Sequence, residues 1–436
     1  MSLFSTLNTG ASGLGVQSSA LSVIGDNIAN LGTTGYKASR ASFADYMPQR
    51  TSTLAGTGSI GSGSGLNTVA TLFGQGSLTT TSSATDMAVS GSGFFMVQDG
   101  NETFYTRAGE FYLDDDGYLV NGAGYNVQGY TADGGTLSTI VDDLLVSTDP
   151  AAASATESVT ISAVLNSETD VATDISSAVF DGASDSWDAI TEDTFTTSIT
   201  VYDEMGEAHE VTVAFERDST SGWSWYALVD GGEMDGGTEE LPFEIARGTM
   251  SFDTDGTLTA FSGTSTSSTG AYSWANGADL GAFDFQLGLD SSGTEIDGAI
   301  SMSGTDSAVS AMSQDGYPLG DLSDISVATD GTITGSYTNG EEIVLGQVVL
   351  ATFSSEAGLE RMGGNLFRAT SASGDAAVGA PGSGGRGDLY SYALEASNVE
   401  LEDEFVNMIT SQRGYQAAAR VISTADETLQ ELVNLV

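Results

Sequence analysis

The side chains that could carry chemistry in this chain are few in kind. Its 436 residues include no cysteine and a single histidine, His209, beside 60 aspartates and glutamates. Disulfide scaffolds, thiolate nucleophiles, cysteine zinc sites and sites built from several histidines are therefore excluded. His209 could serve one Ser–His–Asp triad, but no G-x-S-x-G elbow occurs in the sequence. His209 lies in a segment with strand–turn–strand character, and we predict that it is a surface turn residue.

Two aspartate-rich segments could be considered as calcium loops. They are Asp114–Gly117 and Asp253–Gly256. Neither has the glutamate and the spacing of an EF-hand loop, and each lies between alternating apolar residues. Hairpin turns explain them better, although weak calcium binding at the acidic surface stays an alternative. No glycine-rich run matches a phosphate or dinucleotide loop. We therefore predict no enzyme: no catalytic residue, no cofactor and no metal site.

The charge of the chain is strongly negative. The formal net charge is −49, and Lys37 is the only lysine. Such a surface repels nucleic acid and anionic lipid, because phosphate binding needs clustered lysine and arginine. No apolar run approaches the roughly 20 residues of a membrane span. The first residues lack the basic and apolar regions of a secretory signal. We therefore predict no nucleic-acid partner and no membrane insertion, and secretion would need another export route.

The first 32 residues have the periodicity of a helix. Two rows of mainly apolar residues recur every seven positions, as in a coiled-coil stripe. One row contains Leu7, Leu14, Leu21 and Ile28, and the other contains Leu3, Gly10, Gln17, Ile24 and Leu31. Each glycine inside this segment destabilises a helix by about 1 kcal/mol relative to alanine. We therefore expect the helix to be marginal alone and to need a partner to form.

Residues 397–436 predict a second helix. Ser397 and Glu400 have the S-x-x-E spacing of a capping box, which places the helix start at residue 397. An apolar stripe follows and includes Phe405, Ile409, Ile422, Leu429, Leu432 and Val436. Both terminal helices could be ordinary core helices, but the sequence contains no other convincing long helix to pack against them. We therefore predict that they pack on each other or on copies of themselves.

Between the helices, short alternating segments with turn residues every eight to twelve positions predict β-structure. The Gly/Ser-rich residues 51–66 and 371–387 predict extended linkers. The predicted fold class is mainly β with terminal α-helices, in which one β domain is inserted into another. The predicted parts are an axial helical coiled-coil domain (1–33, 394–436), linkers (34–75, 371–393), an inner β domain (76–148, 315–370) and an outer β domain (149–314).

The eleven lysines and arginines are the available trypsin sites. Three of them, Lys37, Arg40 and Arg50, lie in or before the first predicted linker, and three, Arg386, Arg413 and Arg420, lie at or after the second. If the two ends of a single chain are unpaired, we expect these six sites to be exposed, because a marginal helix leaves its neighbours accessible. Central sites such as Arg217 and Arg247 should resist cleavage, because they lie among predicted strands.

The most specific pattern is Asp26–Lys37, which reads D-N-I-A-N-L-G-T-T-G-Y-K. Farther along, Ala393–Val399 reads A-L-E-A-S-N-V, and residues 405–416 read F-V-N-M-I-T-S-Q-R-G-Y-Q. In these paired signatures the chain resembles the axial proteins of the bacterial flagellum. Hook and rod members of that family share Tyr105–Phe111, which reads Y-T-R-A-G-E-F. Resemblance to the hook members in particular comes from Ser42–Met47, Val201–Asp203 with Gly206 and His209, and Asp315–Gly320.

The resemblance implies a structural subunit of the flagellar hook. Such subunits self-assemble into a flexible helical tube that transmits torque from rod to filament, outside the cell. The implied partners are many copies of the chain itself, the distal rod protein, the hook cap, the hook–filament junction proteins and the flagellar type III export apparatus. Two alternatives are a distal rod or hook-associated protein, and a secreted acidic calcium-binding adhesin or enzyme.

The residues expected at contacts between subunits come from the two helices and the first signature. They are Leu3, Leu7, Leu14, Leu21, Ile24, Ile28, Asn27, Asn30, Phe405, Ile409, Ile422, Leu429, Leu432 and Val436. The apolar members are expected to line the helix contacts of the tube.

Overall fold

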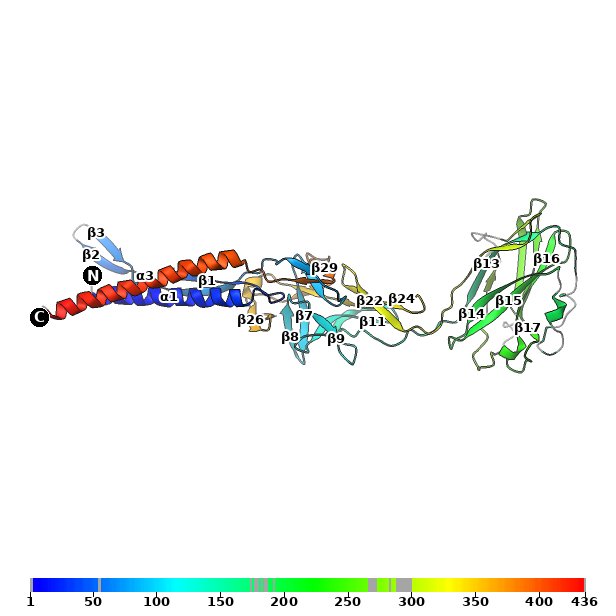
Figure 1. Cartoon of the computed structure of the whole chain (residues 1–436), viewed down its shortest axis with the longest axis horizontal. Coiled ribbons are helices and arrows are strands. Elements are labelled where there is room, and N and C mark those ends of the chain that lie inside the picture. Colours follow the sequence, from blue (N-terminus) through cyan, green and yellow to red (C-terminus); the bar gives the residue numbers. More distant parts are fainter. Residues whose placement is uncertain are drawn as a thin grey trace. The chain divides into compact units, whose positions relative to one another are not determined.

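The computed structural model of the chain describes residues 3–53, 56–172, 175, 180–181, 183, 187–190, 193–265, 273–281, 284–287 and 300–434. The chain divides into two compact units, which we call unit 1 and unit 2 (Figure 1). Unit 1 contains residues 1–148, 323–336 and 342–436, and unit 2 contains residues 149–322 and 337–341. Unit 2 is thus inserted into unit 1. The four-part division that the sequence predicts is finer than these two units and stays a prediction.

Unit 1 begins and ends with helices that pack together. α1 (Leu3–Ala29) and α3 (Leu401–Asn434) lie side by side, blue and red in Figure 1. The two helices run antiparallel, because Gly10 near the start of α1 faces Ile422, whereas Asn27 near its end bonds to Glu404. The prediction that the terminal helices pack on each other is confirmed.

The start of α3 differs from the prediction. The helix begins at Leu401, so Ser397 and Glu400 do not form the expected capping box. The backbone N–H of Ala396 donates instead to the carbonyl of Ser77, at 2.8 Å. Because this bond ties the preceding segment to a distant part of the chain, that segment stays extended and the helix starts later.

The Gly/Ser-rich segments contain paired strands, so the prediction of extended linkers was wrong. β1 (Ser39–Asp45) pairs with β4 (Ser64–Thr71), and β2 (Gln49–Thr53) pairs with β3 (Gly56–Ile60). In the second segment, β28 (Ala377–Gly379) pairs with β25 (Leu350–Thr352). β1 and β4 also pack against α1. Composition predicted extended linkers, but threonine, serine and valine in these segments pair with a strand partner that sequence alone does not reveal.

A 13-stranded sheet forms most of the remainder of unit 1. Its strands are β7 (Phe94–Asp99), β8 (Glu102–Thr106), β9 (Phe111–Leu113), β10 (Leu119–Asn121), β11 (Asn126–Asp133), β12 (Thr136–Asp143), β22 (Leu322–Val327), β23 (Thr332–Tyr337), β24 (Glu342–Val348), β25, β26 (Glu360–Gly363), β27 (Leu366–Arg368) and β28. The main order is β22-β23-β24-β11-β7-β8-β27-β26. Strands from both sides of the insertion meet in this sheet, since Gly129 of β11 lies opposite Val348 of β24. The rings of Phe94, Tyr105 and Phe367 belong to one buried cluster beside it.

Two short strand pairs tie the segment before α3 to the first part of the chain. β29 (Asp388–Ser391) pairs with β6 (Met87–Ser90), and β30 (Ala393–Glu395) pairs with β5 (Leu78–Thr80). The end of β30 also lies next to the residues that follow α1, since the Gly35 N–H donates to the Glu395 carbonyl at 2.7 Å. A short 3-10 turn, η4 (Glu356–Gly358), lies between β25 and β26.

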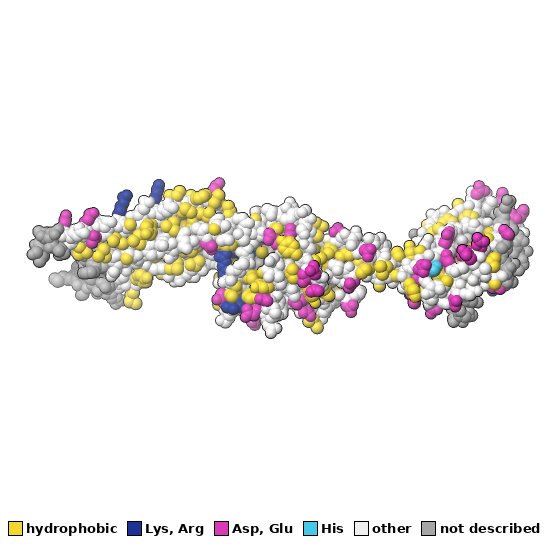
Figure 2. Space-filling model, turned by 60° about the horizontal axis from the view of Figure 1, so that its bottom comes forward, with side chains coloured by type: hydrophobic (Ala, Val, Ile, Leu, Met, Phe, Trp, Pro, Cys, Tyr) yellow, Lys and Arg dark blue, Asp and Glu magenta, His cyan; other side chains and the backbone are white. Residues whose placement is uncertain are grey.

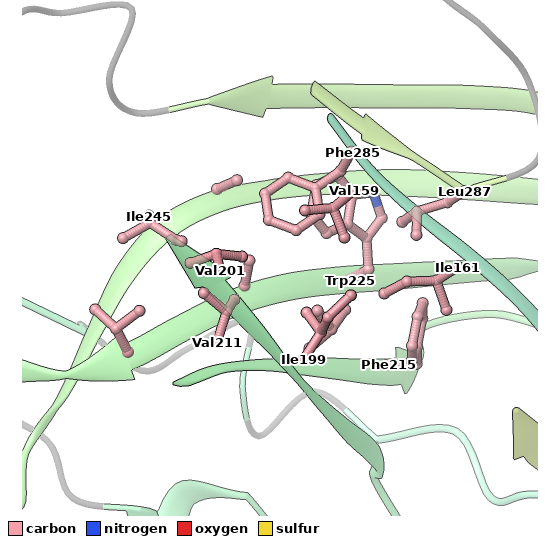
Figure 3. Close-up of a cluster of buried hydrophobic side chains, with 14 of the residues drawn as sticks. Val159, Ile161, Ile199, Val201, Val211, Phe215, Trp225, Ile245, Phe285 and Leu287 are labelled. Atoms are coloured by element: carbon pink, nitrogen blue, oxygen red, sulfur yellow. The ribbon is translucent and has the colours of Figure 1, made fainter. Parts of the chain in front are cut away.

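Unit 2 consists of two sheets around one core. The five-stranded antiparallel sheet contains β14 (Phe195–Tyr202), β15 (Ala208–Arg217), β16 (Gly222–Asp230), β17 (Pro242–Phe252) and β18 (Leu258–Ser265), in that order. The other sheet contains β13 (Ser158–Asn166), β19 (Asp284–Gln286), β20 (Ser301–Ser303) and β21 (Ala308–Gln314). Two short 3-10 turns are η1 (Trp187–Ala189) and η2 (Gly231–Glu233). Figure 3 shows Val159 and Phe285 of one sheet packed with Val211 and Trp225 of the other.

Both aspartate-rich segments are hairpin turns, as predicted. Asp114 joins β9 to β10 and accepts the Tyr118 N–H at 2.7 Å through its Oδ1. Asp253 does the same between β17 and β18, accepting the Thr257 N–H at 2.9 Å. Gly117 and Gly256 take the left-handed conformation that these turns require, with φ of 84° and 82°.

The predicted fold class, mainly β with terminal helices, is confirmed. Within the described part of the chain, no helix is long and apolar enough to cross a membrane.

Candidate subunit interface

Glycines allow α1 and α3 to approach closely. A Cβ added to Gly10 would lie 2.8 Å from Cγ1 of Ile422, and one added to Gly414 would lie 2.9 Å from the Gln17 side chain. The row that contains Gly10, Gln17 and Ile24 therefore faces α3, and Ile24 is buried. Glycines that weaken an isolated helix thus serve the contact between the two helices.

The other predicted row is only half-buried in the single chain. Leu7, Leu14, Leu21 and Ile28 each keep part of their surface accessible beside α1's contacts with α3 and the β1–β4 hairpin. Periodicity predicted both rows but could not say which one faces the partner helix. The row of Leu7, Leu14, Leu21 and Ile28 thus keeps accessible apolar surface that other contacts could cover.

α3 exposes a set of large apolar side chains. Phe405 is 47% exposed, Val406 is 62% exposed and Ile409 is 50% exposed. Figure 2 shows hydrophobic side chains spread along the surface of the helical part. Ile422 and Leu429 are half-buried, and Ile422 contacts α1. Large apolar groups left in water after intrachain packing indicate a surface that another molecule covers.

The asparagines of the first signature differ in their surroundings. Asn27 is buried; its Nδ2 donates to the carbonyl of Ser39 at 2.8 Å and to Glu404 Oε1 at 3.0 Å. The Ser39 N–H donates in turn to Asn27 Oδ1 at 2.8 Å. Asn30 makes only local bonds to Asp26 and Thr33. Asn27 therefore joins α1, β1 and α3, whereas Asn30 closes the end of α1.

Three predicted interface residues lie beyond what the structure describes. The backbones of Leu3 and Leu432 belong to α1 and α3, but their side chains are outside the described part, and so is Val436.

A buried ionic cluster holds the two ends of unit 1 together. Lys37 donates to Glu395 Oε1 at 2.7 Å, and Arg107 Nη1 lies 3.4 Å from Glu395 Oε2. The side chains of Lys37, Glu395 and Arg107, which we call the Glu395 cluster, are 1%, 0% and 4% exposed. The N–H of Gly76 donates to Glu395 Oε1 at 2.8 Å, and Lys37 also donates to Gly74 O at 2.9 Å.

The burial of this cluster changes the acid–base properties of its cations. Burial lowers the pKa of Lys37, and the nearby Glu395 carboxylate opposes that effect. Burial also lowers the pKa of Arg107, again against the influence of Glu395. The Glu395 carboxylate therefore offsets the cost of burying two cations together.

Sequence reasoning missed the Glu395 cluster. The expectation that Lys37 is an exposed trypsin site was wrong for the folded chain, because β30 brings Glu395 onto it. A signal was present: each of the three residues lies in a recognised motif, G-Y-K, Y-T-R-A-G and A-L-E-A-S-N-V. Their pairing across the chain could not be read from the motifs.

Further signature residues complete the junction. The Ala38 N–H donates to Asn398 Oδ1 at 2.7 Å, and Asn398 Nδ2 donates to the carbonyls of Leu72 and Gly74 at 2.8 and 2.9 Å. The Arg361 guanidinium lies 4.4 Å from the centre of the Tyr36 ring. Residues of the two sequence signatures thus meet at one junction between the ends of unit 1.

His209 is buried in unit 2, so the prediction of a surface turn residue was wrong. Its ring stacks on Trp274 with centroids 3.6 Å apart, and its Nδ1 and Nε2 lie 3.0 Å from Glu233 and 3.4 Å from Asp203. Burial tends to raise the Asp203 pKa, but hydrogen bonds from Asn276, the backbone and His209 lower it overall. Ligand atoms of Asp203, Glu207 and His209 lie within 4.8 Å of one another, a spacing that could hold a metal ion. Asn276 Nδ2 donates to Asp203 Oδ2 at 2.5 Å and to Glu207 Oε2 at 2.7 Å, so hydrogen bonds already hold these two carboxylates in place.

Family models match four stretches of the chain. The model described as Flagella basal body rod protein matches residues 7–37, and Flagellar hook protein FlgE/F/G D1 domain matches residues 88–176. Flagellar basal body protein FlaE D2 domain matches residues 174–317, and Flagellar basal body rod FlgEFG protein C-terminal matches residues 390–435.

Curated relatives match nearly the whole chain. Flagellar hook protein FlgE of Salmonella typhimurium is 36% identical over 430 residues, which cover 97% of this chain and 98% of the relative. The protein of the same name from Escherichia coli is 35% identical over 432 residues, with the same coverage, 97% and 98%. That from Borreliella burgdorferi is 32% identical over 455 residues, covering 99% of each chain.

Among solved structures, the crystal structure of Helicobacter pylori flagellar hook protein FlgE2 resembles this chain with a TM-score of 0.50 and 15% identity. The match covers 73% of this chain and 100% of the other. At that identity the likeness concerns the fold alone.

Proposed function

Because the chain belongs to the flagellar hook protein family, we propose that its paired terminal helices form the contacts that build a helical tube from many copies. The chain is a structural subunit of the hook, part of the flagellum outside the cell, and not an enzyme. The proposal assigns the tube-forming contacts to α1 and α3 and the flexible outer surface to unit 2.

The observation that carries this proposal is the apolar surface left open after α1 and α3 have paired. Phe405, Val406 and Ile409 are each about half exposed or more, at 47%, 62% and 50%. The row of Leu7, Leu14 and Leu21 adds half-buried surface on α1. Complete burial of a fully exposed apolar side chain contributes roughly 1.5–3 kcal/mol, so covering each of these half-exposed side chains contributes about half of that. A neighbouring copy supplies that cover in the tube.

Folding and polymerisation are coupled in this proposal. Glycines make α1 weak as an isolated helix, so contacts with neighbouring copies add to its stability. Unit 2 exposes many acidic side chains (Figure 2). Hydrated, like-charged surfaces attract one another little, which suits subunits that must shift against their neighbours when the tube bends.

The same apolar surface on the helices is the basis for the other partners that we propose. A copy at either end of the tube presents helices that no further copy covers. The distal rod protein, the hook cap and the hook–filament junction proteins are the partners we propose for those ends. We propose the flagellar type III apparatus for export.

The test is polymerisation of purified full-length chain with Ile409→Asp. Ile409 is 50% exposed, so the variant should fold like the wild type in the single chain. In the tube it would bury a charge, which should raise the critical concentration at least about a hundredfold. Sedimentation and electron microscopy measure tube formation, and circular dichroism checks the fold of the single chain.

Leu319→Asp is the matched control. Leu319 is 58% exposed and lies in unit 2, outside the helices. It should leave the critical concentration nearly unchanged. Normal tubes from Ile409→Asp, or loss of tubes from Leu319→Asp alone, would contradict the assignment of the interface to the helices.

A further inference from the structure

The turn between β14 and β15 gathers two carboxylates and the single imidazole of the chain. Asp203 directly follows β14, Glu207 directly precedes β15, and His209 is the second residue of β15. The Asp203 N–H donates to the Glu207 carbonyl at 3.1 Å, and Gly206 takes the left-handed conformation with a φ of 80°. Because the turn is this tight, ligand atoms of Asp203, Glu207 and His209 come within 4.8 Å of one another.

The carboxylates around His209 have no lysine or arginine beside them. Among the residues that the structure describes, neither cation forms an ion pair with Asp203, Glu207 or Glu233. The Asp203 side chain is 0% exposed, so water does little to stabilise its charge. Asn276 donates to Asp203 and Glu207, but each carboxylate oxygen has a second lone pair for a further partner. Three carboxylates around one imidazole therefore favour a bound cation.

The two ring nitrogens of His209 have different surroundings. Nδ1 lies 3.0 Å from Glu233 Oε2, the distance of an ordinary hydrogen bond, so the ring proton belongs on Nδ1. Nε2 lies 3.4 Å from Asp203 Oδ2, which is longer than the about 2.7–3.2 Å of N–H···O bonds. The lone pair of Nε2 therefore faces the Asp203 carboxylate. A carboxylate that accepts the far N–H of a histidine is the usual support of a metal-binding imidazole.

We propose that Asp203, Glu207 and His209 bind one divalent transition-metal ion such as Zn²⁺, through two carboxylates and Nε2. Two ligand atoms of a tetrahedral zinc ion, each about 2.0–2.1 Å from the metal, lie about 3.3–3.4 Å apart. The 3.4 Å between Nε2 and Asp203 Oδ2 fits this geometry. Ca²⁺ fits less well, because it prefers about six to eight oxygen ligands.

The ion can reach this site from solvent. Glu207 is exposed, so its carboxylate can move onto an ion that enters beside it. Figure 2 shows the histidine side chain, cyan, in view among acidic side chains. The sequence motifs predicted no metal site, because neither aspartate-rich loop has suitable ligand spacing. The proposed site lies apart from those loops, belongs to unit 2 alone and does not depend on tube formation.

The test is calorimetric titration of metal-free, full-length single chain with Zn²⁺, in an excess of Ca²⁺ that occupies weak sites on the acidic surface. We expect one tightly bound Zn²⁺ per chain. Glu207→Gln keeps the size of the side chain and an acceptor for Asn276, so it should fold normally, as circular dichroism checks. It should weaken Zn²⁺ binding by at least about tenfold, because it removes one charged ligand. Glu204→Gln is the matched control, since Glu204 is exposed in the same turn, and it should bind Zn²⁺ like the wild type.

Trp274 reports where the ion binds. Its ring stacks on His209 with centroids 3.6 Å apart, so Cu²⁺ held by the imidazole should quench its fluorescence. Trp274→Phe keeps an aromatic ring on His209 and should remove the quenched part of the emission. No Zn²⁺ binding by the wild type, equal Zn²⁺ affinity of Glu207→Gln and Glu204→Gln, or unchanged quenching in Trp274→Phe would each overturn the inference. All these measurements use single chains, so their failure leaves the proposed function, which tube formation tests, untouched.

Discussion

Replacement of Glu395 by glutamine tests how the ends of unit 1 are held together. The substitution keeps the shape of the side chain but leaves Lys37 and Arg107 buried beside each other without their ion-pair partner. It also weakens the acceptor for the Gly76 N–H. Removing one partner of a buried ion pair destabilises proteins by about 3–5 kcal/mol. All three side chains are at most 4% exposed, so water cannot supply the missing solvation and we expect the full effect.

The assay is trypsin cleavage of full-length single chain, with the cut sites identified by mass spectrometry. Lys37 and Arg107 are themselves trypsin sites that the folded cluster protects. When cleavage follows local opening, its rate rises with the population of the open form. A loss of about 3–5 kcal/mol corresponds to about a hundredfold to a few thousandfold faster cleavage at these two sites. Cleavage at Arg217 and Arg247 in unit 2 should not change and provides the internal reference.

Glu360→Gln is the matched control for this experiment. Glu360 pairs with Arg368 at 2.8 Å, but their side chains are 52% and 43% exposed. Exposed pairs contribute about 0–1 kcal/mol, so cleavage at Lys37 and Arg107 should accelerate less than about fivefold. If Glu395→Gln behaves like Glu360→Gln, the cluster does not lock the two ends and the reasoning is refuted.

Three further outcomes are expected. Gly109→Ala should destabilise unit 1 by about 3 kcal/mol or more, because the added Cβ would overlap the carbonyl of Met87, and urea unfolding measures the loss. Gly10→Val should weaken the pairing of α1 with α3, since Ile422 lies 2.8 Å from the added Cβ position, and Ile422→Ala in the same chain should recover part of the lost helicity seen by circular dichroism. Because the pKa of Asp203 is lowered in the folded chain, its ionised carboxylate stabilises unit 2 at pH values above 3.8, the ordinary pKa of aspartate. This stabilisation is lost as the pH falls through the folded-state pKa. Asp203→Asn should therefore lower the stability of unit 2 at pH 7 and flatten its loss below about pH 4, as read by tryptophan fluorescence, whereas Asp255→Asn in an exposed turn should do neither.

Much of the fold could be predicted because its terminal helices and hairpin turns depend on patterns of residues that are close together in the sequence. Heptad spacing identified α1 and α3, and Asp-Gly turns between alternating segments identified hairpins at 114–117 and 253–256. Periodicity could not show that the row of Gly10 and Gln17, rather than that of Leu14 and Leu21, faces α3. That choice depends on how closely two backbones approach, which is a property of the pair.

The remaining errors concern contacts between residues far apart in sequence. Glu395 meets Lys37 across 358 positions, and nothing near either residue encodes the other. His209 was placed on the surface because its neighbours form a turn, but Trp274 and Glu233 cover it from other segments. In each case local sequence predicted the local conformation, and tertiary contacts decided burial and electrostatics.

The insertion of unit 2 into unit 1 has a consequence for the order of folding. Residues 149–322 are continuous and contain nearly all of unit 2, so its contacts need only moderate loop closure. Unit 1 must instead bring together segments on both sides of that insertion, as when Gly129 of β11 meets Val348 of β24. Closing a loop through an unfolded insertion is slower and entropically less favourable than closing it through a folded one whose ends lie near each other. We therefore expect unit 2 to fold first and to act as the scaffold that lets the large sheet of unit 1 close.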